Sequence, residues 1–260
     1  MKEFVKRLLG GSETSPQEAV KPCLPAGERL YCVGDIHGRL DLLINLQEQI
    51  VADAASFSGD KSVVYLGDYI DRGDESRQVV DRLLESPLEG FESVHLLGNH
   101  EQTLLDFLKH PESVAAWLTY GGRATLHSYG VTATSQHVMQ DLADLRDELE
   151  SSLPPEHLEF YRRLELYHLA GDYCFVHAGI RPGVTLPEQR EQDLLWIRDD
   201  FTASENVHDY VVVHGHTITP QVEFCHNRIG IDTGAFHSGV LTCLVLEKED
   251  QRLLATGERG

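Results

Sequence analysis

From residue 29 onward, short apolar runs alternate with longer amphipathic segments. Three runs, RLYCV, SVVYL and SVHLL, predict buried strands at residues 29–33, 62–66 and 93–97. Apolar residues with the helical period predict helices at residues 40–54, 76–86 and 103–110. Strands that alternate with helices pair in parallel through right-handed crossovers. The chain is therefore expected to have an α/β fold.

A short polar motif follows each of these three predicted strands. The motifs are GDIHG at residues 34–38, GDYIDRG at residues 67–73 and GNHE at residues 98–101. In open α/β sheets, functional residues gather in the loops beyond the carboxyl ends of the strands. We therefore expect the polar side chains of the three motifs to lie together at one edge of the sheet.

Residues 111–165 interrupt this alternation, and their pattern predicts a mostly helical insertion. The pattern that follows is mainly strand, with little helix between the strands. The expected strands lie within ELYHL (165–169), YCFVHAG (173–179), DYVVVHGHT (209–217), NRIGID (227–232) and GVLTCLVLE (239–247). A second sheet is therefore expected.

A chain of 260 residues with 41% hydrophobic residues can bury a large core, in one domain or in two smaller ones. We favour one domain over residues 29–250, which contains the insertion and follows an N-terminal segment and linker at residues 1–28. The opening stretch MKEFVKRLLGG favours a terminal helix over a membrane-surface helix. No apolar run approaches the roughly 20 residues of a membrane span, and no signal peptide is indicated.

Charge and cysteine content restrict the class of partner and the compartment. Asp and Glu total 42 against 22 Lys and Arg, and a net charge of -20 repels a phosphate backbone. This argues against a nucleic-acid partner, although not against a small phosphate site with local positive charge. The five cysteines show no CxxC spacing, so neither a disulfide framework nor a zinc knuckle is indicated. A cytoplasmic protein fits best, and the oligomeric state cannot be read from the sequence.

Residue types that bind divalent metal ions follow five of the predicted strands. They are Asp35, His37, Asp68, Asn99, His100, His177, His214 and His216. Carboxylate oxygens mixed with imidazoles and an amide suit manganese, iron or zinc better than calcium. An isolated Asp-x-His is a weak indication of a metal site, whereas five such loops in one chain are a strong one.

The motifs GDIHG, GDYIDRG, GNHE, HAG and GHT, in this order, resemble the calcineurin-like metallophosphoesterase superfamily. Within it, they are similar to the phosphoprotein phosphatase family, in its bacterial and phage-like serine/threonine protein phosphatase branch. The resemblance covers about residues 29–247. It implies a sandwich of two mixed β-sheets flanked by helices, with a dinuclear metal centre at one end.

The resemblance also implies the metal ligands. Asp35 and His37 would bind one ion, Asn99 and His177 would bind the other, and Asp68 would bridge the two. Two divalent ions about 3.5 to 4 Å apart hold a bridging hydroxide for in-line attack on phosphorus. Manganese is the first choice for both ions, with iron and zinc as alternatives.

One further ligand is expected from the motif VVVHGHT, which offers two histidines. His216 directly precedes Thr217 and so matches the family position, which makes it our choice. His214 is the less favoured candidate. Spacing does not decide between them, because residues two apart on a strand project the same way.

The resemblance assigns the catalytic roles as well. His100 would donate a proton to the leaving oxygen, which is worth roughly 100- to 10,000-fold for an alkoxide. Asp71 would orient His100. Arg72 matches one phosphate-binding arginine, and Arg198 in LLWIRDD matches the arginine of the phage-like branch, since a planar guanidinium suits phosphate oxygens. His237 in TGAFHSG lies where relatives often place an aromatic residue, and a contact with substrate there is the less favoured interpretation.

Two enzymatic functions and one non-enzymatic role are considered. The first is a phosphatase acting on phosphoserine or phosphothreonine in proteins, with phosphotyrosine left open. The alternative is a symmetrical bis(5′-nucleosyl)-tetraphosphatase, whose motifs typically depart from DRG and carry GNHD. The pair Asp71 and Arg72, together with Glu101, favours the first. A catalytically silent binding module would lack a metal ligand, and the sequence retains them all.

Overall fold

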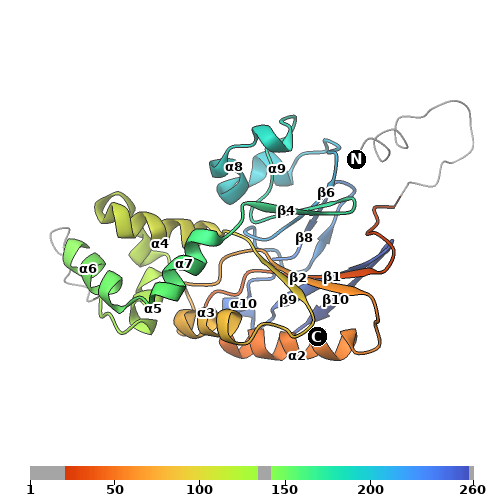
Figure 1. Cartoon of the computed structure of the whole chain (residues 1–260). Coiled ribbons are helices and arrows are strands. Elements are labelled where there is room, and N and C mark those ends of the chain that lie inside the picture. The colour runs from red at the N-terminus through yellow and green to blue at the C-terminus, as the bar shows by residue number, and fades with distance from the viewer. Residues whose placement is uncertain (1–20, 134–141, 258–260) are drawn as a thin grey trace, which may run out of the picture.

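The computed structural model describes residues 21–133 and 142–257, and it confirms the predicted α/β fold with two mixed sheets (Figure 1). The first sheet has the strand order β10-β9-β1-β2-β3. Its strands are β1 Glu28–Val33, β2 Asp60–Tyr65, β3 Glu92–His95, β9 Thr242–Glu247 and β10 Asp250–Ala255. The three N-terminal strands are parallel, as the alternation with helices predicts, whereas β9 runs antiparallel to both β1 and β10.

The second sheet is built after the insertion and has the order β4-β5-β6-β8-β7. Its strands are β4 Tyr167–Ala170, β5 Tyr173–Val176, β6 Val211–His214, β7 Glu223–Phe224 and β8 Arg228–Gly230. The central strands β5, β6 and β8 are parallel, and the two edge strands are antiparallel to their neighbours. The carboxyl ends of β5 and β6 carry the HAG and HGHT motifs.

The two sheets pack face to face around an apolar core. Side chains alternate in direction along a strand, so Leu30 and Cys32 of β1 join this inter-sheet core together with Phe175 of β5. Tyr31 and Val33 of β1 belong instead to the core on the outer side of the first sheet. Because β1 is buried on both faces, it reads as a continuous apolar run rather than an alternating one.

Helices cover both outer faces of the sandwich (Figure 1). On the first sheet lie α2 Leu40–Ala54 and α3 Ser76–Glu85, whose Leu43, Leu46 and Val80 join the same core as β1. On the second sheet lie α8 Glu191–Trp196 and α9 Asp199–Thr202, preceded by the short 3₁₀ turn Leu186–Glu188. One further short helix, α10 Ala235–Ser238, follows β8.

The predicted insertion is helical in the part that the structure describes. It follows α4 Asn99–Lys109 and contains η1 Pro111–Thr119, α5 Gly122–Ser128, α6 Leu142–Ser152 and α7 Pro155–Arg163. These helices project to one side of the sandwich (Figure 1). Trp117, Leu126 and Phe160 share one apolar core with α2 and α3, so the insertion is an integral part of the domain.

The domain extends beyond the predicted range of 29–250 at both ends. Leu24, expected in the linker, is 3% exposed and donates its backbone N–H to the carbonyl of Lys248 at 2.9 Å. At the other end, β10 continues to Ala255 because its backbone pairs with β9 along six residues. The predicted N-terminal helix, within residues 1–11, lies outside the described residues.

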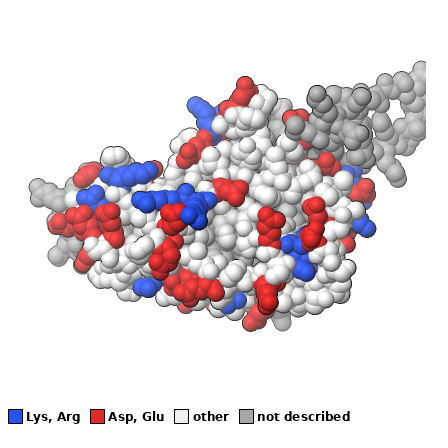
Figure 2. Space-filling view, viewed as in Figure 1, with Lys and Arg blue, Asp and Glu red and all other residues white. Residues whose placement is uncertain are grey.

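No helix in the described part of the chain is both long and apolar enough to cross a membrane. Four cysteines in this part, Cys32, Cys174, Cys225 and Cys243, are free thiols. On the face shown in Figure 2, basic side chains are interspersed with a larger number of acidic ones.

Candidate metal centre

Backbone hydrogen bonds join the loops that follow β1 and β2. The N–H groups of Ile36 and His37 both donate to the carbonyl of Asp68, at 3.1 and 2.8 Å. The loops also approach closely at two glycines, since a Cβ atom added to Gly38 would lie 2.5 Å from the carbonyl oxygen of Gly73. The glycines of GDIHG and DRG are therefore needed for this contact, which places His37 beside Asp68.

Glu101 joins the third loop to the second. Its buried carboxylate accepts hydrogen bonds from the backbone N–H groups of Asp68, Tyr69 and Ile70 at 2.8 to 3.2 Å. The same carboxylate accepts a hydrogen bond from the backbone N–H of Gly98 at 3.1 Å, and this bond caps the first turn of α4. One side chain thus fixes the GDYIDRG loop against the helix that begins with Asn99.

Strained backbone conformations concentrate in these loops. Among the described residues, six that are not glycine have a positive φ angle. Five of them are predicted site residues, with φ between 48° and 72°: His37, Asp68, Asp71, Arg72 and His216. Such conformations cost of order 1–3 kcal/mol each and cluster at functional sites. They aim these side chains into a shared space.

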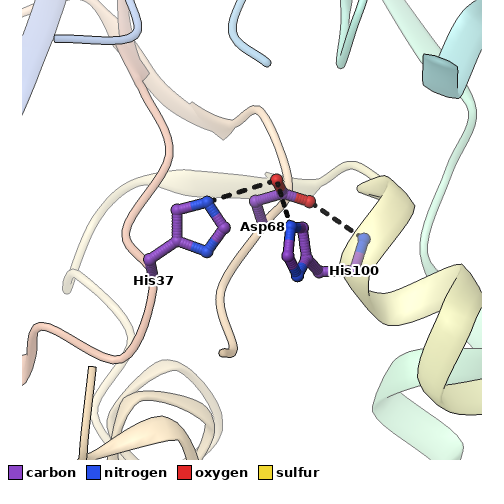
Figure 3. A group of neighbouring side chains, drawn as sticks. All are labelled: His37, Asp68 and His100. Atoms are coloured by element: carbon purple, nitrogen blue, oxygen red, sulfur yellow. Dashed lines mark hydrogen bonds and ion pairs between the residues drawn. The ribbon is translucent and has the colours of Figure 1, made fainter. Parts of the chain in front are cut away.

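Asp68 lies at the centre of the candidate site. Its Oδ2 is 3.4 Å from Nε2 of His37 and 3.8 Å from Nε2 of His100 (Figure 3). Its Oδ1 is 3.4 Å from Nε2 of His177. The two oxygens of one carboxylate therefore face different histidines, as expected of a residue that bridges two ions.

Two groups of possible ligand atoms share Asp68. One comprises His37, Asp68 and His100, and the other comprises Asp68, His177 and His216. Asn99 belongs beside the second group, because its Oδ1 lies 2.9 Å from Nε2 of His177. The six predicted ligands are all buried.

The ring nitrogens of these histidines are prepared for metal binding. Nδ1 of His37 lies 2.8 Å from the carbonyl of Ile70, and Nδ1 of His177 lies 2.9 Å from that of Leu66. A carbonyl only accepts, so the proton is on Nδ1 and the lone pair on Nε2. Within the described residues, Nε2 of His37 and of His216 have no hydrogen-bond partner although they are buried. A divalent cation would satisfy them.

Asp35 lies on the other side of the site, beside the HGHT loop. Both of its carboxylate oxygens accept from the backbone N–H of His216, at 3.1 and 3.3 Å. Burial raises the pKa of Asp35 well above its usual range, and the charges of Asp232 and Asp68 add to the effect. A cation would relieve this crowding of buried carboxylates.

The two histidines of HGHT have different surroundings. His216 shares a group with Asp68 and His177, and its ring lies 5.0 Å from that of His177. His214 is absent from both groups; its Nδ1 donates to the carbonyl of Gly215 and its ring packs edge-on against Phe201.

Protonation states also suit a metal ion. Burial lowers the pKa of His37 to about 3 and that of His216 to about 2, with nearby charges acting in both directions. Burial alone would raise the pKa of Asp68, but the histidines around it, His177 first, lower it below its usual value. Neutral imidazoles beside an ionised carboxylate are the forms that bind metal. The donor set therefore fits two divalent ions.

His100 stands beside this set and is held by Asp71. Its Nδ1 lies 2.5 Å from Oδ2 of Asp71, and its Nε2 lies 3.3 Å from Nη2 of Arg72. Burial lowers the pKa of His100, but the carboxylates of Asp68 and Asp71 outweigh it and raise the pKa to about 9. Asp71 thus holds the ring at Nδ1, which leaves Nε2 facing the space beside Asp68.

Two further arginines lie in loops near the motifs, and the sequence analysis assigned a role to Arg198. Arg198 is exposed at the start of α9, and its Nη1 reaches the carbonyl of His216 at 3.4 Å, so it borders the site. Arg181 of the HAGIRPG segment pairs instead with Asp193 and Asp200, at 2.7 and 3.2 Å.

An aromatic residue next to His237 contacts the site. The ring of Phe236 lies 5.6 Å from that of His37, and the guanidinium of Arg72 stacks over it at 4.6 Å. His237 itself is exposed. The short α10 thus turns Phe236 rather than His237 toward the loops, and a contact of His237 with substrate stays the less favoured interpretation.

Comparisons with known proteins identify the family and the fold. The sequence family described as calcineurin-like phosphoesterase matches residues 28–236. A protein of Bacillus thuringiensis (strain Al Hakam) named asymmetrical bis(5′-nucleosyl)-tetraphosphatase PrpE is 23% identical, over 82% of this chain and 88% of its own. A protein of the same name from Halalkalibacterium halodurans is 25% identical, over 82% and 87%.

Solved structures of two kinds share the fold. One protein, described provisionally as a diadenosine tetraphosphatase, superposes with a TM-score of 0.60 at 22% identity, covering 93% of this chain and all of its own. A cold-active protein tyrosine phosphatase superposes with a TM-score of 0.59 at 17% identity, covering 89% and 81%. At these identities the likeness concerns the fold alone.

Proposed function

Because the chain belongs to the calcineurin-like phosphoesterase family, we propose that it is a metal-dependent hydrolase of phosphate esters with a dinuclear centre around Asp68. The observation that carries the proposal is the position of Asp68, whose two carboxylate oxygens face His37 and His177 separately. Asp35, Asn99 and His216 would complete the two ligand sets. When bound, the ions supply the attacking nucleophile by lowering the pKa of a water molecule.

The chain's own residues then bind the phosphate and protonate the leaving group. Arg72 and Arg198 border the site and would bind the equatorial phosphate oxygens, whose charge must be stabilised during transfer. Asp71 holds Nδ1–H of His100, so that Nε2 is directed toward the substrate. A proton given from Nε2 to the leaving oxygen avoids release of a free alkoxide.

Phosphoserine and phosphothreonine in proteins are the first substrates we propose. Their leaving groups are alkoxides, for which a held proton donor such as His100 has its largest effect. The His100–Asp71 contact of 2.5 Å supports this choice. Phosphotyrosine remains open, because its phenolate leaves with less assistance. Manganese is the first metal we propose, with iron and zinc as alternatives. The free thiols of Cys32, Cys174, Cys225 and Cys243 support a cytoplasmic location.

A second candidate is asymmetrical hydrolysis of dinucleoside tetraphosphates, which is the activity in the names of the relatives above. One feature of the site favours it. Trp196 of α8 is 39% exposed although its ring lies 6.4 Å from that of His216. Its indole N–H is fixed by Gln102 at 2.7 Å. An aromatic face held there would stack on a nucleobase. The symmetrical reaction considered from the sequence stays a prediction.

Kinetics on purified protein with manganese will test both candidates. Phosphoserine, phosphothreonine and phosphotyrosine peptides should be compared with diadenosine tetraphosphate by kcat/KM. Higher values on the first two peptides support the first proposal. Release of ATP and AMP from the dinucleotide at a higher kcat/KM supports the second candidate, whereas release of two ADP molecules identifies the symmetrical reaction. Failure of the metal-loaded protein on all four substrates would refute the proposed function.

A further inference from the structure

The carboxylate of Asp71 is fully buried and is bonded by three side chains. His100 Nδ1 and the indole Nε1 of Trp117 both donate to Oδ2, at 2.5 and 2.6 Å. The hydroxyl of Thr125 donates to Oδ1. Only one of these three donors, His100, comes from a family motif. The other two belong to the helical insertion, where Trp117 is in η1 and Thr125 is in α5.

The same two side chains are themselves held firmly. The ring of Trp117 is 3% exposed and packs on Gly122, where an added Cβ atom would lie 2.5 Å from the indole. Thr125 is fully buried, and its hydroxyl also accepts the backbone N–H of Asp71 at 2.9 Å. Gly122 and Thr125 of the segment YGGRAT therefore both support the contacts made with Asp71.

We propose that Trp117 and Thr125 are positioning residues for the general acid, and we call this pair the carboxylate clamp. The proposal rests on the proposed function, in which His100 gives the proton. By binding one oxygen each, the two donors fix the rotation of the Asp71 carboxylate about its last side-chain bond. The carboxylate in turn fixes the ring of His100 through Nδ1.

The physical need for a clamp follows from the soft torsion of an aspartate. The terminal torsion of Asp is broad and roughly two-fold, so a carboxylate with one partner is free to rotate. Proton transfer requires a donor within about 2.6–3.2 Å of the leaving oxygen, and small displacements of reacting groups are costly. Buried polar atoms are almost always hydrogen-bonded, so a carboxylate oxygen that loses one partner favours rotation toward another. The insertion thus helps to orient the general acid His100.

A positioning role for the clamp predicts unequal losses of kcat on two substrates, whereas a merely structural role predicts equal losses. Trp117→Phe keeps an aromatic ring but removes the N–H, and Thr125→Val keeps the shape but removes the hydroxyl. We expect each variant to lower kcat on a phosphoserine peptide by about 10-fold or more, within the roughly 100- to 10,000-fold worth of a general acid. On 4-nitrophenyl phosphate, whose leaving group needs no proton, the loss should stay below about 3-fold.

Tyr129→Phe is the matched control in the same insertion. Its hydroxyl is buried and bonds Nδ1 of His157 at 2.8 Å and the hydroxyl of Tyr161 at 2.9 Å, without touching Asp71. This variant should lose stability to a similar extent and yet affect both substrates equally. Metal content and melting temperature should be measured on every variant, so that a folding defect is recognised.

His100→Asn separates failure of the clamp from failure of the proposed function. One outcome is that His100→Asn lowers kcat more on the peptide than on 4-nitrophenyl phosphate, whereas Trp117→Phe and Thr125→Val, folded and metal-loaded, lower both equally. That outcome refutes the clamp and leaves His100 as the proposed acid. If His100→Asn lowers hydrolysis of both substrates equally, the proposed acid is wrong and the clamp is refuted with it.

NMR gives a readout besides activity, because the chain has two tryptophans. The indole proton assigned through Trp117→Phe should shift in Asp71→Asn, and an unmoved signal would contradict the hydrogen bond.

Discussion

Two histidines separated by one glycine have very different surroundings in the HGHT motif. Among the described residues Nε2 of both histidines is buried without a partner, but the ring of His216 adjoins His177 whereas that of His214 packs against Phe201. We expect His216→Ala to lower the occupancy of one metal ion and to remove nearly all activity. His214→Ala should keep both ions and lose at most about 10- to 100-fold, as for a residue outside the ligand set.

Metal analysis of the two purified variants will check this assignment. The matched pair differs by two positions on one segment, so a general folding defect should affect both. An ion lost from the His214 variant and retained in the His216 variant would reverse the assignment.

The proposed metal ligands and the proposed acid could be identified from the sequence because each belongs to a short motif directly after a strand. Trp117 and Thr125 could not, since they contact Asp71 from 46 and 54 residues away. The sequence between them and DRG carries no periodic pattern that indicates the contact. The contact of Phe236 with the site was not identified either, because a four-residue helix leaves the direction of a side chain unspecified.

At the scale of elements, the first turn of α4 depends on Glu101. Its carboxylate accepts four backbone N–H groups from two loops. Glu101→Gln replaces one acceptor oxygen by an amide that donates, so buried N–H groups lose their partners. We expect the free energy of unfolding to fall by about 1–3 kcal/mol or more, and metal affinity to fall because Asp68 and Asn99 are loosened.

Urea unfolding and metal titration of the Glu101 variant provide the measurement. Glu112→Gln, at an exposed position in η1, is the matched control and should change neither quantity. Unchanged stability and metal affinity in Glu101→Gln would show that the carboxylate does not organise the loops.

Strand β3 contains a histidine that makes stability depend on pH. His95 stacks on Tyr65 with ring centroids 5.1 Å apart, and burial lowers its pKa to about 4. The unfolded chain, with a pKa of about 6.5, binds the proton first, so this contribution is present above pH 6.5 and is lost as pH falls toward 4. Between pH 7 and pH 5 the loss is about 2 kcal/mol.

The comparison of His95→Phe with the parent protein isolates this effect, because the other titrating groups are common to both. The variant should lose about 2 kcal/mol less between pH 7 and pH 5 in urea unfolding. Parallel pH profiles for the two proteins would contradict the assignment.

Long, strongly patterned elements were predictable and short ones were not. The expected helix at 40–54 and the structure's α2 Leu40–Ala54 coincide, because its apolar residues recur with the helical period. β7 has only two residues, and its pairing with β8 leaves no alternation to detect. β10 is polar at its start and lies at the sheet edge, so its sequence DQRLLA gives no continuous apolar run.

At the scale of the whole molecule, the fold brings five distant loops to one place. The parallel strands β1 to β3 deliver Asp35, Asp68 and Asn99 from one sheet, and β5 and β6 deliver His177 and His216 from the other. The alternation of strands and helices predicted the first half of this arrangement. How the insertion packs was beyond prediction, because its contacts with α3 and Asp71 are all distant in sequence.

The central claim is that two metal ions held around Asp68 carry the hydrolysis. The most direct test measures metal content and hydrolysis of 4-nitrophenyl phosphate on the same samples, after chelation and during graded return of manganese. The metal-free protein should be inactive, and activity should return as occupancy approaches two ions per chain. Asp68→Asn should bind fewer ions and stay inactive. Full activity of verified metal-free protein, or normal turnover of Asp68→Asn with both ions bound, would contradict the claim.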